Sequence, residues 1–68
     1  MAVSTFFIKD ISGERDIQGL EQFLANLSGI ERALFDTDDN EIKIEYNEKE
    51  IELKQIVDNI QHQGFKIQ

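Results

Sequence analysis

The sequence predicts an α+β sandwich in which two helices cover one face of a four-stranded antiparallel sheet, in the chain order βαββαβ. Apolar and polar residues alternate in residues 41–46, which is typical of a half-buried strand. In residues 17–28 and 52–63 apolar residues recur every three or four positions, which is typical of amphipathic helices. The chain has 68 residues and no cysteine, so we expect one domain, residues 1–68, without disulfide bonds or thiolate ligands.

The first strand is predicted at residues 5–8. Alternation places Phe6 and Ile8 toward the helices and Phe7 on the opposite face. The first helix is predicted at residues 17–28, and its apolar stripe consists of Ile17, Leu20, Phe23, Leu24 and Leu27. Asp16 stands directly before this stripe, so we expect its carboxylate to cap the helix by accepting bonds from free N–H groups of the first turn. Gly29 follows and is expected to end the helix.

The second half of the chain is predicted to contain a hairpin, a helix and a closing strand. Strands at residues 30–36 and 41–46 are joined by the polar turn 36–40, and a helix at 52–63 precedes a short strand at 65–68. The expected core positions are Ile30, Ala33, Phe35, Ile42, Ile44, Tyr46, Leu53, Ile56, Val57 and Ile60.

Two right-handed crossovers in this order give the ferredoxin-like sandwich, which leaves the second face of the sheet open. Alternation places Phe7 and Leu34 on that open face, where exposed apolar side chains indicate a surface for a partner or for self-association.

The charge balance limits the partners. Seven basic residues stand against 14 acidic ones, a net charge of −7. Nucleic acid is excluded because phosphate neutralisation needs a basic face, and a protein with a basic surface is favoured instead. No apolar run is long enough for membrane insertion, and the first residues do not have the pattern of a secretory signal. We therefore expect a cytoplasmic location.

The residues from Asp16 onward resemble the heavy-metal-associated domain, the fold of small copper chaperones and of N-terminal domains of copper-transporting ATPases. With Asp16 at the family's second cysteine position, the family pattern continues without a gap. It is carried by Leu20, Glu21, Leu24, Leu27, Gly29, Ile30, Ala33, Phe35, Ile42, Ile44 and Tyr46. Gly64-Phe65 is similar to the family's Gly-Tyr or Gly-Phe before the last strand. The resemblance implies one heavy-metal-associated-like domain over residues 1–68.

The departure from the family falls on its metal loop, Gly-Met-x-Cys-x-x-Cys. Asp10 stands in place of the glycine, Ile11 in place of the methionine, and Gly13 and Asp16 in place of the two cysteines. The family binds Cu(I) between two thiolates, because a soft cation prefers soft sulfur ligands. The resemblance thus implies the fold and a relation to metal transport, without the usual copper site.

Three functions remain open at this point. The first is a non-catalytic interaction or regulatory module without a cofactor. The second is a metal carrier in which Asp10, Glu14 and Asp16 bind a hard cation weakly through oxygen ligands. The third is a small-molecule-binding regulatory domain of the same topology. An enzyme is not expected, because the sequence offers no nucleophile–base pair.

Three further features are interpreted as structural. His62 is the single histidine, and its position near a helix C-terminus is favoured by the helix dipole. Residues 36–41 superficially resemble a calcium loop, but Glu41 stands in place of its glycine at the sixth position and Asn47 in place of its glutamate at the twelfth, which predicts a solvated turn. Arg15 is flanked by Glu14 and Asp16, which would repel an anion.

Overall fold

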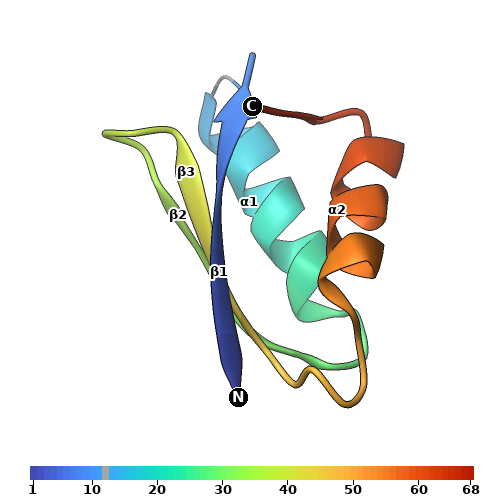
Figure 1. Cartoon of the computed structure of the whole chain (residues 1–68). Helices are drawn as coiled ribbons and strands as arrows, with labels where there is room; N and C mark the ends of the chain where they lie inside the picture. The colour runs from blue at the N-terminus through green and yellow to red at the C-terminus, as the bar shows by residue number, and fades with distance from the viewer. Residues whose placement is uncertain (12) are drawn as a thin grey trace.

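The structure is a computed structural model that describes residues 1–11 and 13–68. Its elements follow the predicted order βαββαβ (Figure 1). They are β1 (Ala2–Lys9), α1 (Gly13–Ala25), β2 (Ile30–Asp36), β3 (Glu41–Tyr46), α2 (Leu53–His62) and β4 (Lys66–Ile67). The four strands form one antiparallel sheet in the order β2-β3-β1-β4, and both helices lie on the same side of it (Figure 1). The predicted fold class is thereby confirmed.

The strand register explains which side chains are buried. On β1, Phe6 lies opposite Ile42 of β3, and Ile42 lies opposite Phe35 of β2. Burial alternates along these strands, so one row of side chains faces the helices and the next row faces solvent. The buried core consists of Ile8, Leu20, Leu24, Ile42, Ile44, Tyr46, Ile51, Ile56 and Ile60. The sheet and both helices thus share one core.

Helix α1 differs from the prediction at both ends. It begins at Gly13, and the apolar period becomes visible only at Ile17 because the first turn is polar and exposed. Asp16 therefore lies inside the first turn, and the prediction that it caps the helix is wrong. Its charge, like that of Glu14, still has a favourable position at the positive end of the helix dipole. The helix ends at Ala25, before residue 28, and a tighter turn follows it.

The core also differs from the prediction around the start of α2. Leu53 is 42% exposed, so its assignment to the core is wrong. Ile51, two residues before the helix, is buried in its place at 7% exposure. Ile17 and Val57 are only half-buried. Glu52 precedes α2 and forms a capping box with Gln55, whose side-chain oxygen accepts the Glu52 N–H at 2.8 Å.

Among the described residues, no helix combines the length and the apolar character needed to cross a membrane.

Candidate functional site

The loop after β1 and the segment before β4 meet at one end of the molecule. Asp10 has a positive φ of 58°, which turns the chain sharply from β1 toward α1. Asp10 and Asp16 line a shallow hollow of about 300 Å³ together with Gly64 and Phe65. The loop at the position of the family's metal site is therefore brought together in space with the Gly64-Phe65 pair that precedes the last strand.

Two lysines complete this hollow. Lys9 and Lys66 line it beside the two aspartates, and the Lys66 Nζ lies 4.0 Å from an Asp10 carboxylate oxygen. Both side chains of this pair are largely exposed, so the pair adds little stability. The pair has a larger effect on metal binding, because the positively charged ammonium group of Lys66 repels a metal cation that approaches Asp10. The lysines were not predicted as site residues, because their position follows from the pairing of β1 with β4 rather than from spacing in the sequence.

The third predicted metal ligand and the single histidine lie elsewhere. Glu14 is exposed on the first turn of α1 and does not line the hollow. His62 lines a separate surface depression on α2 with Gln55, Asp58 and Asn59. Of the residues that the structure describes, the hollow thus offers two carboxylates and two ammonium groups, and no soft ligand.

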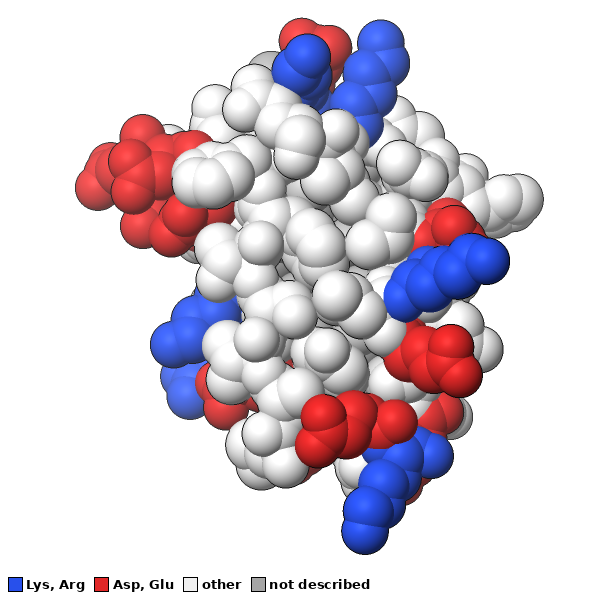
Figure 2. Space-filling model, in the orientation of Figure 1, with Lys and Arg blue, Asp and Glu red and all other residues white. Residues whose placement is uncertain are grey.

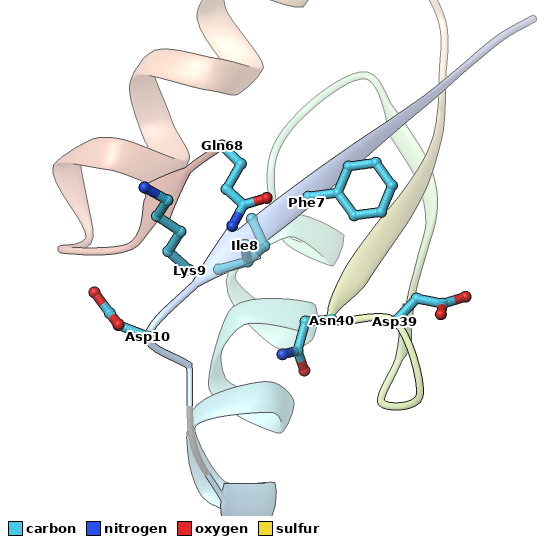
Figure 3. A pocket seen from close by; sticks show the side chains of 7 residues that line it. All are labelled: Phe7, Ile8, Lys9, Asp10, Asp39, Asn40 and Gln68. Atoms are coloured by element: carbon cyan, nitrogen blue, oxygen red, sulfur yellow. The ribbon is translucent and has the colours of Figure 1, made fainter.

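A second hollow, of about 420 Å³, adjoins the first. Lys9 and Asp10 line both, and the remaining wall comes from β1, the β2–β3 turn and the last residue (Figure 3). Its lining residues are Phe7, Ile8, Lys9, Asp10, Asp39, Asn40 and Gln68. The Phe7 ring projects from the sheet on the side of the turn (Figure 3).

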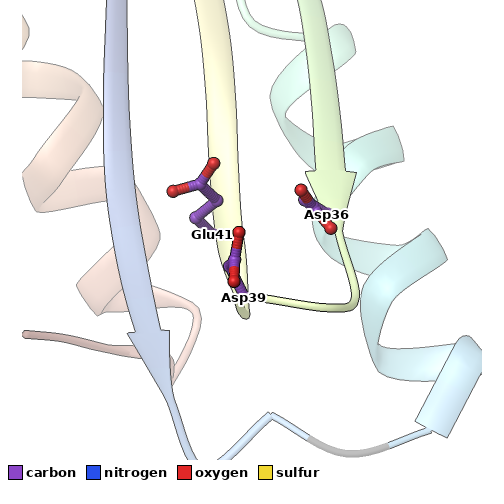
Figure 4. Close-up of side chains that lie close together, drawn as sticks. All are labelled: Asp36, Asp39 and Glu41. Atoms are coloured by element: carbon purple, nitrogen blue, oxygen red, sulfur yellow. The ribbon is translucent and has the colours of Figure 1, made fainter.

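Three carboxylates come close together at the β2–β3 hairpin. Oxygens of Asp36, Asp39 and Glu41 lie within 4.8 Å of one another (Figure 4). The Asp36 carboxylate also accepts the N–H of Asp38 at 3.0 Å, which is the bond of an Asx turn. Asp36 and Asp39 are exposed and Glu41 is half-buried. The predicted turn is confirmed, and the cluster is an acidic corner of the surface.

Phe7 and Leu34 lie on the open face of the sheet as predicted, 48% and 45% exposed. They do not form one patch. Leu34 lies opposite Lys43 of β3 and Phe7 lies opposite Glu41, so a charged strand separates them. An interaction role for Phe7 and Leu34 stays a prediction. A partner that contacts either residue would also meet the charged residue opposite it on β3.

Comparisons with known proteins agree with this architecture. No protein-family model matches the chain. The copper chaperone CopZ of Staphylococcus haemolyticus is 27% identical over 60 residues, which cover 88% of each chain.

Solved structures superpose closely on the fold. A CopZ metallochaperone matches 98% of this chain and 100% of its own, with a TM-score of 0.91 at 18% identity. The N-terminal domain of a potential copper-translocating P-type ATPase from Bacillus subtilis, in the Cu(I)-loaded state, matches 97% of this chain and 82% of its own. Its TM-score is 0.89 at 20% identity. These matches confirm the resemblance to heavy-metal-associated domains and the ferredoxin-like fold.

Proposed function

We propose that this chain is a non-catalytic interaction module of the metal-transport type, in which the heavy-metal-associated fold is kept and the Cu(I) site is lost. The observation that carries this proposal is the composition of the metal loop. Gly13 and Asp16 occupy the two cysteine positions, and the chain has no cysteine elsewhere. Without a thiolate, a Cu(I) ion has none of the ligands that hold it in this family. The sequence relatives are named copper chaperones, which supports a role in metal transport.

A hard cation is a weaker candidate for the same loop. Two carboxylates in the hollow would suit Mg²⁺ or Zn²⁺ only if no positively charged side chain stood close to them. Lys9 and Lys66 line the same hollow, so their two positive charges balance the two negative charges of the aspartates. This balance favours a module without a bound metal over a metal carrier.

The surface charge supports a basic protein partner. Acidic side chains outnumber basic ones two to one in the chain, and Figure 2 shows them gathered at the hairpin and near the opposite end of the molecule. Such a surface attracts a basic patch on another protein and speeds its association.

A metal titration tests the proposal directly. Cu(I), Zn²⁺ and Mg²⁺ are added in turn while NMR follows the amide signals of residues 10–17. We expect no saturable shift in the micromolar range for any ion. Saturable micromolar shifts confined to this loop would show that the chain is a metal carrier.

Restoring the cysteines tests whether only the ligands were lost. The variant Gly13→Cys/Asp16→Cys returns both thiols to the loop, and a Cβ at position 13 meets nothing within 4 Å, although its φ of 80° is strained for a side chain. We expect this variant to bind Cu(I) with one-to-one stoichiometry in a competition assay with a chromophoric chelator. The matched control, Gly13→Ser/Asp16→Ser, has the same shape without sulfur and should not bind. Equal Cu(I) affinity of the parent and the cysteine variant would refute the loss of the site.

A further inference from the structure

The open face of the sheet has one row of side chains, next to the β2–β3 turn, that combines an aromatic ring with carboxylates. Phe7 of β1 lies opposite Glu41 of β3, and Glu41 lies opposite Asp36 of β2. Their neighbours along the strands face the helices, so these three side chains lie on the open face. Phe7 is 48% exposed. Together with Asp39 of the turn, the row forms what we call the aromatic–acidic surface.

The strand register brings the ring close to a carboxylate. The Ile8 N–H donates to the Asn40 carbonyl at 2.8 Å, at the end of the ladder between β1 and β3. Hydrogen-bonded and non-hydrogen-bonded pairs alternate along such a ladder, so Phe7 and Glu41 form a non-hydrogen-bonded pair. Side chains of these pairs approach each other more closely than those of hydrogen-bonded pairs. The Phe7 ring and the Glu41 carboxylate can therefore contact one ligand together.

The carboxylates of this surface have no cationic partner in the described part of the chain. Oxygens of Asp36, Asp39 and Glu41 lie within 4.8 Å of one another (Figure 4). Within residues 1–11 and 13–68, the one ion pair joins Lys66 to Asp10, which belongs to the loop after β1. Figure 2 shows the hairpin accordingly as a cluster of acidic side chains. Their mutual repulsion is relieved when a cation binds between them.

Two lysines on the same face flank the aromatic–acidic surface without neutralising it. Lys43 lies one row further from the turn, opposite Thr5 and Leu34. Lys9 extends away from the Phe7 ring (Figure 3). Neither lysine forms an ion pair with a described carboxylate. The surface therefore presents negative charge beside an exposed ring, which is complementary to a cation that also has an apolar face.

We propose that the aromatic–acidic surface docks an arginine side chain from a basic segment of a partner protein. This inference rests on the proposed interaction module and identifies where its basic partner binds. A guanidinium group is planar, donates several hydrogen bonds in that plane and stacks on aromatic rings. It can thus lie against the Phe7 ring while its N–H groups donate to the carboxylates of Glu41 and Asp39.

The composition of the surface favours arginine over a metal ion. Mg²⁺ and Ca²⁺ are held by about six or more oxygen ligands, and an aromatic ring supplies none. The Asp36 carboxylate already accepts the Asp38 N–H at 3.0 Å. A guanidinium group is weakly hydrated and gains attraction from the Phe7 ring as well as from the carboxylates. A second copy of the chain is disfavoured, because each copy carries a net charge of −7.

The central test uses two matched peptides. In one peptide arginine alternates with glycine, and in the other the neutral residue citrulline, which has nearly the same shape, replaces every arginine. NMR follows the ring signals of Phe7 and the amide signals of residues 36–41 at low salt, where surface charges are least screened. We expect saturable shifts with a Kd of about 1 mM or tighter for the arginine peptide, and none for the citrulline peptide.

Three variants divide the affinity between ring and charge. Phe7→Leu keeps an apolar side chain and removes the ring, so it should weaken the arginine peptide about twofold to fivefold. Asp39→Asn removes one carboxylate charge and should weaken it by a similar factor. Glu48→Gln is the matched control, because Glu48 is exposed beyond the far end of β3 and its loss changes the net charge equally. This control should bind the peptide like the parent.

Several results would overturn the arginine site. They are no saturable shift up to about 1 mM arginine peptide, equal affinity for the citrulline peptide, or an unchanged Kd in Phe7→Leu. A loss in Glu48→Gln as large as that in Asp39→Asn would likewise show that only the total charge matters. Tighter binding of Mg²⁺ at the amides of residues 36–41 would make the surface a metal site.

The two proposals of the article fail on different signals. Failure of the arginine site leaves the loss of the Cu(I) site standing, because that loss is tested at the amides of residues 10–17. Saturable Cu(I) binding at those amides would refute the proposed function, and the response of Phe7 and residues 36–41 to the arginine peptide would be unaffected.

Discussion

At the scale of single residues, substitution by alanine should have opposite effects on stability at Gly29 and Gly19. Gly29 has a φ of 95°, and a Cβ built on it would lie 2.7 Å from Cγ2 of the buried Ile51. Gly29→Ala therefore combines a strained backbone with overpacking, and we expect it to lower the free energy of unfolding by about 2–4 kcal/mol. Urea denaturation measures this change.

Gly19→Ala supplies the control for that measurement. Gly19 lies inside α1, and a Cβ there meets nothing within 4 Å. Alanine restricts the unfolded chain and suits a helix, so this variant should be more stable than the parent by about 0.5–1 kcal/mol. If both alanine variants unfolded at the same urea concentration, the close approach of Gly29 to Ile51 would be wrong.

At the scale of elements, one carboxylate of α1 adds a hydrogen bond to the apolar contact between α1 and β2. Glu21→Ala leaves the Phe35 N–H without its acceptor at the sheet edge. We expect a loss of about 1–2 kcal/mol in the free energy of unfolding and faster hydrogen exchange at the Phe35 amide. Glu21→Gln keeps an acceptor oxygen and should lose less than half as much. Unchanged exchange at Phe35 in Glu21→Ala would contradict this role.

The elements also show how far the sequence alone could lead. The bounds of β2 and β3 agree with the prediction, because polar turn residues flank both and the alternation along β3 is strict. The start of α1 was missed, because apolar periodicity reports only the buried face and the first turn of this helix has none. Ile51 was missed for a related reason: a single apolar residue in a loop has no period, and only the folded chain shows that it fills the core.

The candidate site was predictable only in part. The resemblance to heavy-metal-associated domains placed Gly13 and Asp16 at the cysteine positions, and it needs only the order of residues along the chain. That Asp10 and Lys66 lie close together depends on the pairing of β1 with β4, two segments at opposite ends of the chain.

At the scale of the whole molecule, the net charge of −7 opposes folding more than ion pairs support it. In the part of the chain that the structure describes, the one ion pair is Lys66 with Asp10, exposed and 4.0 Å apart. The acidic corner at Asp36, Asp39 and Glu41 contains three carboxylates, and none of them forms an ion pair within the described residues. Folding brings these like charges closer together than they are in the unfolded chain, so their repulsion lowers the free energy of unfolding.

Salt should therefore stabilise this protein. Raising NaCl from about 10 mM to about 150 mM shortens the screening length from about 30 Å to about 8 Å. If screening recovers about 0.5–1 kcal/mol, the Tm of a domain of this size rises by about 2–8 °C, which calorimetry resolves. Asp39→Asn removes one charge from the acidic corner, so it should raise the Tm at low salt and flatten the dependence on salt. A Tm that falls as NaCl is added would mean that attractive pairs outweigh repulsion, and the acidic corner would then have to be stabilised by contacts other than charge.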